Sequence, residues 1–309
     1  MTSVSIIGGG VLGLTVAHEL AARGFGVTVI AAQGHREAVS SVAAAIWFPH
    51  DVTPTPRVLA SAEVTYRRLV ALAGDPSTGV RLRHGTVVHR TPDPDLSWVP
   101  AVPGGAAPAD APPPGASGVR CLLPLVVTDA YLGWLHREVQ SLGVRFESRT
   151  VARLDEVAGD AVVVAAGLGS AALLGGDDEV YPIRGQVVRL SNPGLTDWLL
   201  DDENPAGLTY VVPRDHDVVC GGTGDVGSWD ETIDPDVEAG ILARATELVP
   251  ELAGQAVLSR AVGLRPARTS VRLEPVPGHG RTVIACYGHG GAGFTLSWGE
   301  AAEVVNLLS

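Results

Sequence analysis

The chain has 309 residues, of which 46% are hydrophobic and 18% charged, and its formal net charge is -12 at pH 7. A chain of this length exceeds what one hydrophobic core usually supports, so we expect two packed units that share one site. The acidic balance and the lack of a polybasic run exclude nucleic acid as a partner. No apolar run approaches the roughly 18 residues of a membrane span, so no membrane partner is expected.

Three scattered cysteines, Cys121, Cys220 and Cys286, form no CxxC pair. An odd number without metal or dithiol spacing fits a reducing cytoplasm. The apolar start lacks a basic region, and glycines interrupt it after four residues, so no cleaved signal is expected.

The first 30 residues predict a βαβ unit. Residues 4–7 are typical of a buried strand, a glycine turn follows, a helix continues to Leu20 and stops at Gly24, and residues 27–30 predict a second strand. The turn reads Gly8-x-Gly10-x-x-Gly13. In this pattern the first glycine permits a tight turn, the second admits a pyrophosphate, and the third lets helix and strand pack closely. The anion would bind at the positive N-terminus of the helix.

The acidic residue that usually binds ribose hydroxyls is missing after the second strand, where Ala31-Ala32-Gln33 stands. Gln33 could supply one hydrogen bond there, or lie in a solvated loop. The sequence therefore predicts a dinucleotide pyrophosphate site and leaves the ribose contact open.

Further along the chain, helical spacing predicts helices over 56–73, 129–142 and 236–249. Strands are expected at 80–82, 86–89, 161–165, 185–190, 209–212, 218–221 and 261–264. The Pro/Gly/Ala-rich stretch 103–118 predicts a mobile surface loop. The order indicates an α/β protein in which a Rossmann-type dinucleotide domain is interleaved with a β-rich α+β domain.

The C-terminal segment carries a second glycine-rich turn. A strand over 282–286 leads into Tyr287-Gly-His-Gly-Gly-Ala-Gly-Phe-Thr and then a last helix. Free backbone N–H groups at a helix start form a second anion or carbonyl cradle. Two such turns, one at each end of the chain, point to one shared cofactor, whereas an NAD dehydrogenase needs only the first.

This C-terminal turn, followed by Gly299-x-Ala301, resembles the signature of the D-amino-acid oxidase family. Three more segments agree with the family in order along the chain. Residues 42–47 (VAAAIW) resemble its second flavin-contacting segment, 184–186 (RGQ) its crossover between domains, and 263–268 (GLRPAR) its substrate-arginine motif. The resemblance spans residues 4–303. It implies an FAD-binding domain from 1–52, 127–181 and 263–309, and a substrate-binding domain from 53–126 and 182–262.

The resemblance also assigns residues to a non-covalently bound FAD. Those expected at the cofactor are Gly8, Gly10, Val11, Leu12, Gly13, Ser40, Ser41, Ala43, Ala44, Ala45, Val151, Gly167, Gly290, Gly291, Gly293, Phe294 and Thr295. The N–H and hydroxyl groups of four of them would stabilise negative charge on the reduced ring, namely those of Gly290, Gly291, Gly293 and Thr295.

For the substrate, the resemblance implies that Arg265 and Tyr210 bind the carboxylate and that the Gly291 carbonyl receives the amine. A guanidinium suits this task because its fork matches a carboxylate with two bonds. A structural ion pair is the alternative for Arg265, since Arg268 and Arg272 are near in sequence. Tyr210 could equally be a core aromatic.

The side-chain pocket is expected to include Ile46, Phe48 and Leu200, followed by the carboxylates 201–203. These carboxylates would repel acidic substrates, although their exposure to solvent is the alternative. The stretch 206–209 leaves no room for the family's lid tyrosine. The nine histidines show no metal spacing, and we interpret His289 as structural.

The sequence thus predicts oxidation of neutral, and in part basic, D-amino acids by hydride transfer to FAD, with O2 reduced to hydrogen peroxide and release of a 2-oxo acid and ammonia. A glycine- or sarcosine-type amine oxidase, a D-aspartate oxidase, an NAD-dependent dehydrogenase and a non-catalytic flavin-binding protein stay open as alternatives. A homodimer also stays open.

Overall fold

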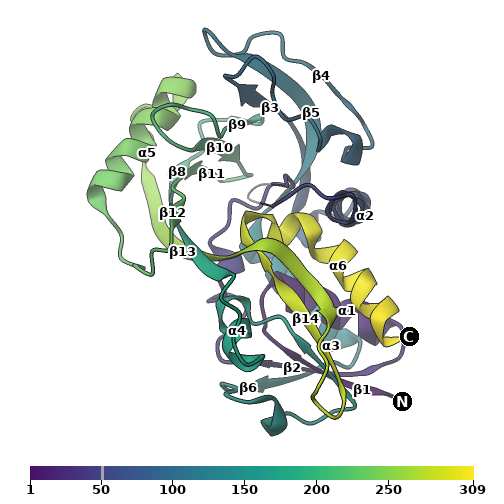
Figure 1. Cartoon of the computed structure of the whole chain (residues 1–309). Helices are drawn as coiled ribbons and strands as arrows, with labels where there is room; N and C mark the ends of the chain where they lie inside the picture. The colour runs from purple at the N-terminus through teal and green to yellow at the C-terminus, as the bar shows by residue number, and fades with distance from the viewer. Residues whose placement is uncertain (50–51) are drawn as a thin grey trace.

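The computed structural model describes residues 1–49 and 52–309. One lobe is built on a parallel sheet of β1 (Ser3–Ile7), β2 (Gly26–Ala31), β6 (Arg145–Ser148), β7 (Ala161–Val164) and β14 (Thr282–His289), in the order β14-β7-β1-β2-β6. Runs of Val and Ile form its central strands because both faces are covered. Helix α1 (Val11–Ala22) packs against α3 (Thr128–Ser141) and α6 (Gly293–Leu308), as Figure 1 shows for the lower lobe.

The second lobe is mostly antiparallel. Its strands are β4 (Ala106–Pro108), β5 (Ser117–Val126), β3 (Val80–His89), β9 (Trp198–Asp201), β10 (Thr209–Pro213), β11 (Asp217–Gly221), β8 (Val180–Ser191) and β13 (Val257–Pro275), in that spatial order, with β12 (Asp225–Val226) beside β8. Helix α5 (Pro235–Leu248) packs on β8, β10 and β11, and α2 (Pro56–Leu72) packs on α6. A short α4 (Ser170–Leu173) follows β7.

Single turns of 3-10 helix connect these elements. They lie at Val39–Ser41, Pro76–Thr78, Val99–Ala101, Leu154–Glu156, Gly167–Gly169, Pro250–Leu252 and Gly290–Ala292.

The long strands β8 and β13 pair with each other and join the two lobes into one continuous sheet (Figure 1). The chain passes between the lobes several times, because β1 and β2 precede the antiparallel strands while β7 and β14 alternate with them. The predicted α/β class, a Rossmann-type unit interleaved with a β-rich one, is confirmed.

Two local expectations were wrong. Residues 80–82 and 86–89 belong to one continuous strand, β3, which includes Gly85. A glycine is needed at this position because a Cβ there would lie 2.1 Å from the ring of Trp198 on the neighbouring strand β9. The stretch 103–118 is not entirely loop, since it contains β4, which pairs with residues 119–121 of β5. β4 is an edge strand, where the missing N–H of Pro108 is tolerated. Among the described helices, none has both the length and the apolar character to span a membrane.

Candidate active site

A large cavity extends from the carboxyl ends of β1 and β2 to the junction of the lobes, with a volume of about 560 Å³. Five segments that are distant in sequence contribute to its lining: the turn after β1, residues 38–48, residues 149–151, residues 165–169 and the turn after β14. Parallel α/β sheets bind ligands at this edge.

The three glycines of the first turn have different tasks. Gly8 has φ 124°, and a Cβ there would lie 2.2 Å from the carbonyl oxygen of Ala165, after β7. A Cβ on Gly13 would lie 2.0 Å from the carbonyl oxygen of Gly8, so Gly13 acts through packing and does not line the cavity. The nearest atom to a Cβ on Gly10 would be Ser40 Oγ, at 3.2 Å. Gly10 therefore borders the cavity where an anion would meet the start of α1.

Ser40 lies against this helix start. Its Oγ accepts a hydrogen bond of 3.1 Å from the N–H of Val11, the first residue of α1. The Ser41 carbonyl accepts from Thr128 Oγ1 at 3.0 Å and from Arg189 at 3.1 Å, and Ser41 is outside the cavity lining. Ser41 thus positions Ser40 rather than contacting a ligand itself.

The segment after Ser41 is held by the second lobe. The N–H of Val126 on β5 donates to the Ala45 carbonyl at 2.9 Å, and the N–H of Trp47 donates to the Pro124 carbonyl at 2.8 Å. Ala45 has φ 55°, a left-handed conformation that is uncommon outside glycine and is often found at ligand sites. The segment lines the cavity through Ala43, Ala44, Ala45, Ile46 and Phe48.

The two glycine-rich turns meet. A Cβ on Gly293, the first residue of α6, would lie 3.5 Å from Leu12 Cδ2 on α1. Gly290, Gly291, Gly293 and Phe294 line the cavity, as expected for a cofactor shared by both ends of the chain.

Thr295 differs from the expectation for it. It is absent from the cavity lining, and its hydroxyl accepts from the Phe48 N–H at 3.1 Å and donates to the Phe48 carbonyl at 2.8 Å. Both bonds go to Phe48, so the Thr295 hydroxyl ties α6 to the cavity wall.

The opposite end of the cavity suits an adenosine group. Gln33, Arg149, Thr150 and Val151 line it, and Arg149 Nε donates to Glu147 at 2.9 Å. Gln33 stands where ribose contacts are made in this fold. Its presence in the lining favours the hydrogen-bonding alternative over the solvated loop.

At the junction of the lobes, Arg265 on β13 lies flat against β8. A Cβ on Gly185 would lie 2.6 Å from its Nη2, so the glycine makes room for the guanidinium. Arg265 Nη1 donates to the Thr223 carbonyl at 2.9 Å, and no carboxylate of the described chain pairs with it. By contrast, Arg268 and Arg272 each contact Asp177 Oδ2 at 3.1 Å. The structural ion pair considered for Arg265 thus belongs to its two neighbours.

Tyr210 on β10 lies over the end of β11. A Cβ on Gly221 would lie 2.1 Å from Cζ of Tyr210, and one on Gly222 would lie 2.9 Å from its hydroxyl oxygen. Burial raises the pKa of Tyr210, an effect that the adjacent Arg265 guanidinium opposes. The hydroxyl therefore keeps its proton at neutral pH and can donate it in a hydrogen bond beside Arg265.

Of the three carboxylates after Leu200, one lines the cavity. Asp201 is fully buried on the other face and binds Arg90, with Nη2 to Oδ2 at 2.6 Å. Glu203 accepts the backbone N–H groups of Arg90 at 2.7 Å and Thr91 at 2.8 Å. Asp202 lines the cavity with Leu200. The predicted approach of three carboxylates to the pocket therefore reduces to one.

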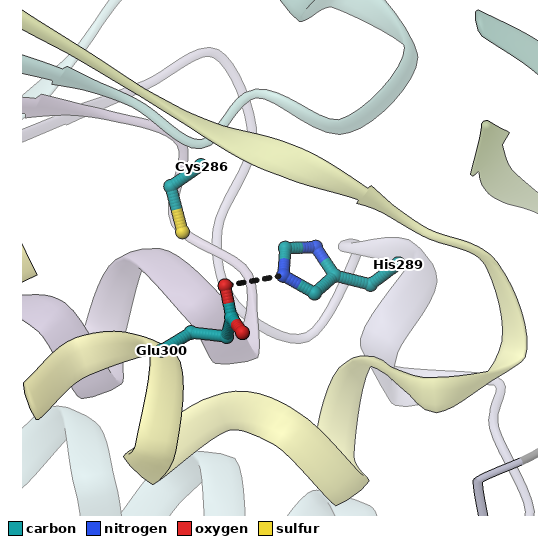
Figure 2. Close-up of side chains that lie close together, drawn as sticks. All are labelled: Cys286, His289 and Glu300. Carbon is teal, nitrogen blue, oxygen red and sulfur yellow. Dashed lines mark ion pairs between the residues drawn. The ribbon is translucent and has the colours of Figure 1, made fainter. Parts of the chain in front are cut away.

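At the cavity wall, Cys286, His289 and Glu300 face one another with one potential metal-ligand atom each, all within 4.8 Å (Figure 2). Cys286 and His289 line the cavity, and Glu300 does not. Glu300 Oε1 accepts from Arg57 Nη1 at 2.9 Å, and Oε2 lies 3.7 Å from His289 Nε2. Burial opposes ionisation of Glu300, but His289 and Arg57 hold its pKa below the usual range. Burial raises the pKa of the Cys286 thiol well above its usual value, which makes it a poor metal ligand. We describe the cluster as a buried ion pair, and the structural interpretation of His289 stays a prediction.

The structure thus brings 19 of the expected cofactor and substrate residues into one cavity and leaves out Gly13, Ser41 and Thr295. Those in the lining are Gly8, Gly10, Val11, Leu12, Ser40, Ala43, Ala44, Ala45, Ile46, Phe48, Val151, Gly167, Leu200, Tyr210, Arg265, Gly290, Gly291, Gly293 and Phe294. Sequence reasoning missed the part that Gly185 and Leu208 take in the wall. The strand pairing that places them has no signal in the sequence.

The residues present fit FAD. The cavity has glycine backbone at the start of α1, Gln33 in one part of its lining and, in another, a guanidinium without a carboxylate partner in the described chain. These groups match a dinucleotide followed by a flavin ring and a carboxylate substrate. A Cβ at Gly10 would lie 3.2 Å from Ser40 Oγ, so a larger side chain would crowd the start of α1.

The model of the DAO family, FAD dependent oxidoreductase, matches residues 3–307. The chain is 42% identical to the D-amino-acid oxidase of Rubrobacter xylanophilus, covering 98% of this chain and 94% of that protein, and 38% identical to the one of Streptomyces coelicolor, covering 99% and 96%. It is 31% identical to the human D-aspartate oxidase, covering 99% and 94%.

Among solved structures, the glycine oxidase of Geobacillus kaustophilus superposes with a TM-score of 0.82 at 20% identity, covering 100% of this chain and 95% of that one. This likeness shows the shared fold. The family match over residues 3–307 and the identity to the two bacterial relatives establish that the chain belongs to the DAO family of FAD-dependent oxidoreductases.

Proposed function

We propose that this protein is a D-amino-acid oxidase that acts on neutral and basic substrates. The observation that carries the proposal is Arg265: a guanidinium without a carboxylate partner in the described chain, beside the Tyr210 hydroxyl, at the end of a cavity that continues to the nucleotide turn. The names of the two bacterial relatives support the same activity.

Arg265 and Tyr210 bind the substrate carboxylate. The guanidinium offers two parallel donors, and the protonated phenol adds a third. Gly185, Gly221 and Gly222 have no side chain and so leave room for Arg265 and Tyr210 to lie flat against the sheet. The two side chains thus have defined directions before substrate binds. Catalysis by such a site is mainly positioning.

Held by the two glycine-rich turns, FAD would supply the acceptor for the Cα hydrogen and two electrons of the substrate, and O2 would take those electrons to give hydrogen peroxide. The Gly291 carbonyl accepts a hydrogen bond from the neutral amine, which loses a proton as the imino acid forms. The imino acid is then hydrolysed to a 2-oxo acid and ammonia. His289 has no role as a base in this scheme.

The division proposed from the sequence agrees with the strand layout: β1, β2, β6, β7 and β14 all come from 1–52, 127–181 and 263–309. We propose these segments as the FAD-binding domain and 53–126 with 182–262 as the substrate-binding domain. Cys121, Cys220 and Cys286 are all buried and free, which supports a cytoplasmic location.

A panel of D- and L-amino acids, glycine and sarcosine, assayed for peroxide, tests the proposal. We expect activity with D-alanine, D-valine and D-leucine and none with their L-forms. Preference for glycine or sarcosine would support an amine oxidase of the glycine type instead. A flavin that is not bleached by D-alanine under anaerobic conditions would indicate a non-catalytic protein.

A further inference from the structure

The cavity wall next to Arg265 and Tyr210 includes the carboxylate of Asp202, which lies two residues beyond Leu200. Strands β9 and β10 pair antiparallel, with Leu200 opposite Tyr210. Continuing that register places Asp202 opposite Leu208, and all four residues line the cavity. The inner step of the wall is thus Leu200 with Tyr210, and the outer step is Asp202 with Leu208.

Asp202 is the first residue after β9, and its place in the cavity wall continues the alternation of that strand. Side chains two residues apart share one face of a strand. Leu200 and Asp202 share the cavity face, whereas Asp201 turns to Arg90 and Glu203 to the backbone of Arg90 and Thr91. Asp202 is the single Asp or Glu among the described residues that line the cavity.

The charges at this end of the cavity are complementary to a substrate with two charged ends. Arg265 and Asp202 line the same cavity as Tyr210, and they act in opposite directions on its pKa, after the larger effect of burial. A step of two residues along a strand is about 7 Å. A lysine or arginine side chain can span this step, and an alanine or valine side chain cannot.

We propose that Asp202 is the specificity residue that binds the cationic end of basic D-amino acids, and that D-lysine and D-arginine are favoured over neutral substrates of the same shape. This inference rests on the proposed function. Asp202 already has an interaction partner in the protein, but a carboxylate has about four acceptor positions and can take a further donor.

Matched pairs of substrates isolate the charge. D-Lysine is compared with D-norleucine, and D-arginine with D-citrulline, in wild type and in Asp202→Asn, with kcat/KM as the readout. We expect the D-lysine to D-norleucine ratio to fall on the order of fivefold in the variant, because the pair lies at an exposed cavity mouth. High salt should lower the same ratio in wild type and have little effect on it in the variant.

Asp197→Asn is the control. Asp197 precedes β9, is half exposed, pairs with Arg120 and does not line the cavity. Asp197→Asn removes one negative charge, as Asp202→Asn does, but away from the cavity. Its D-lysine to D-norleucine ratio of kcat/KM should therefore stay at the wild-type value. A reverse variant, Asp202→Lys, should favour D-glutamate over D-norleucine relative to wild type.

The outcomes separate the inference from the function on which it rests. If wild type oxidises D-norleucine and Asp202→Asn leaves the ratio unchanged, the specificity role is wrong and the oxidase assignment stands. An equal loss for both substrates would mean that Asp202 acts on the α-amine, which also overturns the inference. No peroxide from any D-amino acid would remove the proposed function itself.

Discussion

Replacing Arg265 by alanine tests the carboxylate anchor directly. The guanidinium donates one bond to the Thr223 carbonyl and has no carboxylate partner in the described chain, so its remaining donors are available to a ligand. Each hydrogen bond to a charged group contributes about 1.5–3 kcal/mol. Loss of a two-bond fork therefore costs about 3–6 kcal/mol, or about 10² to 10⁴ in kcat/KM. The fold loses one bond to Thr223, about 1 kcal/mol.

The assay compares peroxide formation from D-alanine with the flavin absorbance and the thermal midpoint of the same preparations. We expect a large loss of kcat/KM with unchanged bound flavin. Arg260→Ala is the matched control, because Arg260 lies on the same strand, pairs with Glu238 and is outside the cavity. Near-normal kinetics in Arg265→Ala, or an equal loss in Arg260→Ala, would refute the assignment of the anchor.

Four further outcomes are expected. Gly10→Val should fill the anion cradle beside Ser40 and yield colourless protein; yellow, active protein would place the nucleotide elsewhere. Glu300→Gln should lower the free energy of unfolding at pH 7 by about 1–3 kcal/mol, since Arg57 loses its charged partner. Because the folded pKa of Glu300 is lowered, this difference should shrink as pH falls below the ordinary value of 4.5, and a constant difference in denaturant titrations would contradict the pairing. Since β9 and β10 are joined by the short turn 202–208 without a lid, a substrate deuterated at Cα should show a substantial isotope effect on kcat, and an effect near unity would contradict a freely opening pocket. D-Aspartate should be used at least roughly tenfold less efficiently than D-valine, because Asp202 repels it; similar kcat/KM values would contradict the pocket assignment.

The nucleotide end of the site could be predicted from local sequence. A strand, a glycine turn and a helix are adjacent along the chain, so Gly8, Gly10 and Gly13 carry their own context. The same holds for the strand and turn before α6. The packing role given to Gly13 in that turn matches the structure, where a Cβ on Gly13 would lie 2.0 Å from the carbonyl oxygen of Gly8 because α1 crosses close over β1.

The substrate end depends on pairing between distant strands. The carboxylates 201–203 are consecutive in sequence, yet Asp201 is buried against Arg90, which is 111 residues earlier. No local sequence pattern indicates that Arg90 binds Asp201, so the sequence analysis placed too many carboxylates at the pocket. The bond from the Thr295 hydroxyl to the Phe48 carbonyl could not be predicted for the same reason, because Phe48 is 247 residues away.

Glycine positions in the antiparallel lobe carry information that was not used as a signal. Gly185 admits the Arg265 guanidinium, Gly221 admits the ring of Tyr210, and Gly85 admits Trp198. A glycine in a strand weakens it unless another group approaches closely, so each one marks a neighbour that lies flat on the sheet. Two of those neighbours, Arg265 and Tyr210, are the proposed substrate anchors. The third, Trp198, lies on the same strand, β9, as Leu200. These glycines, within or at the ends of strands, therefore help to locate the substrate site once the strand order is known.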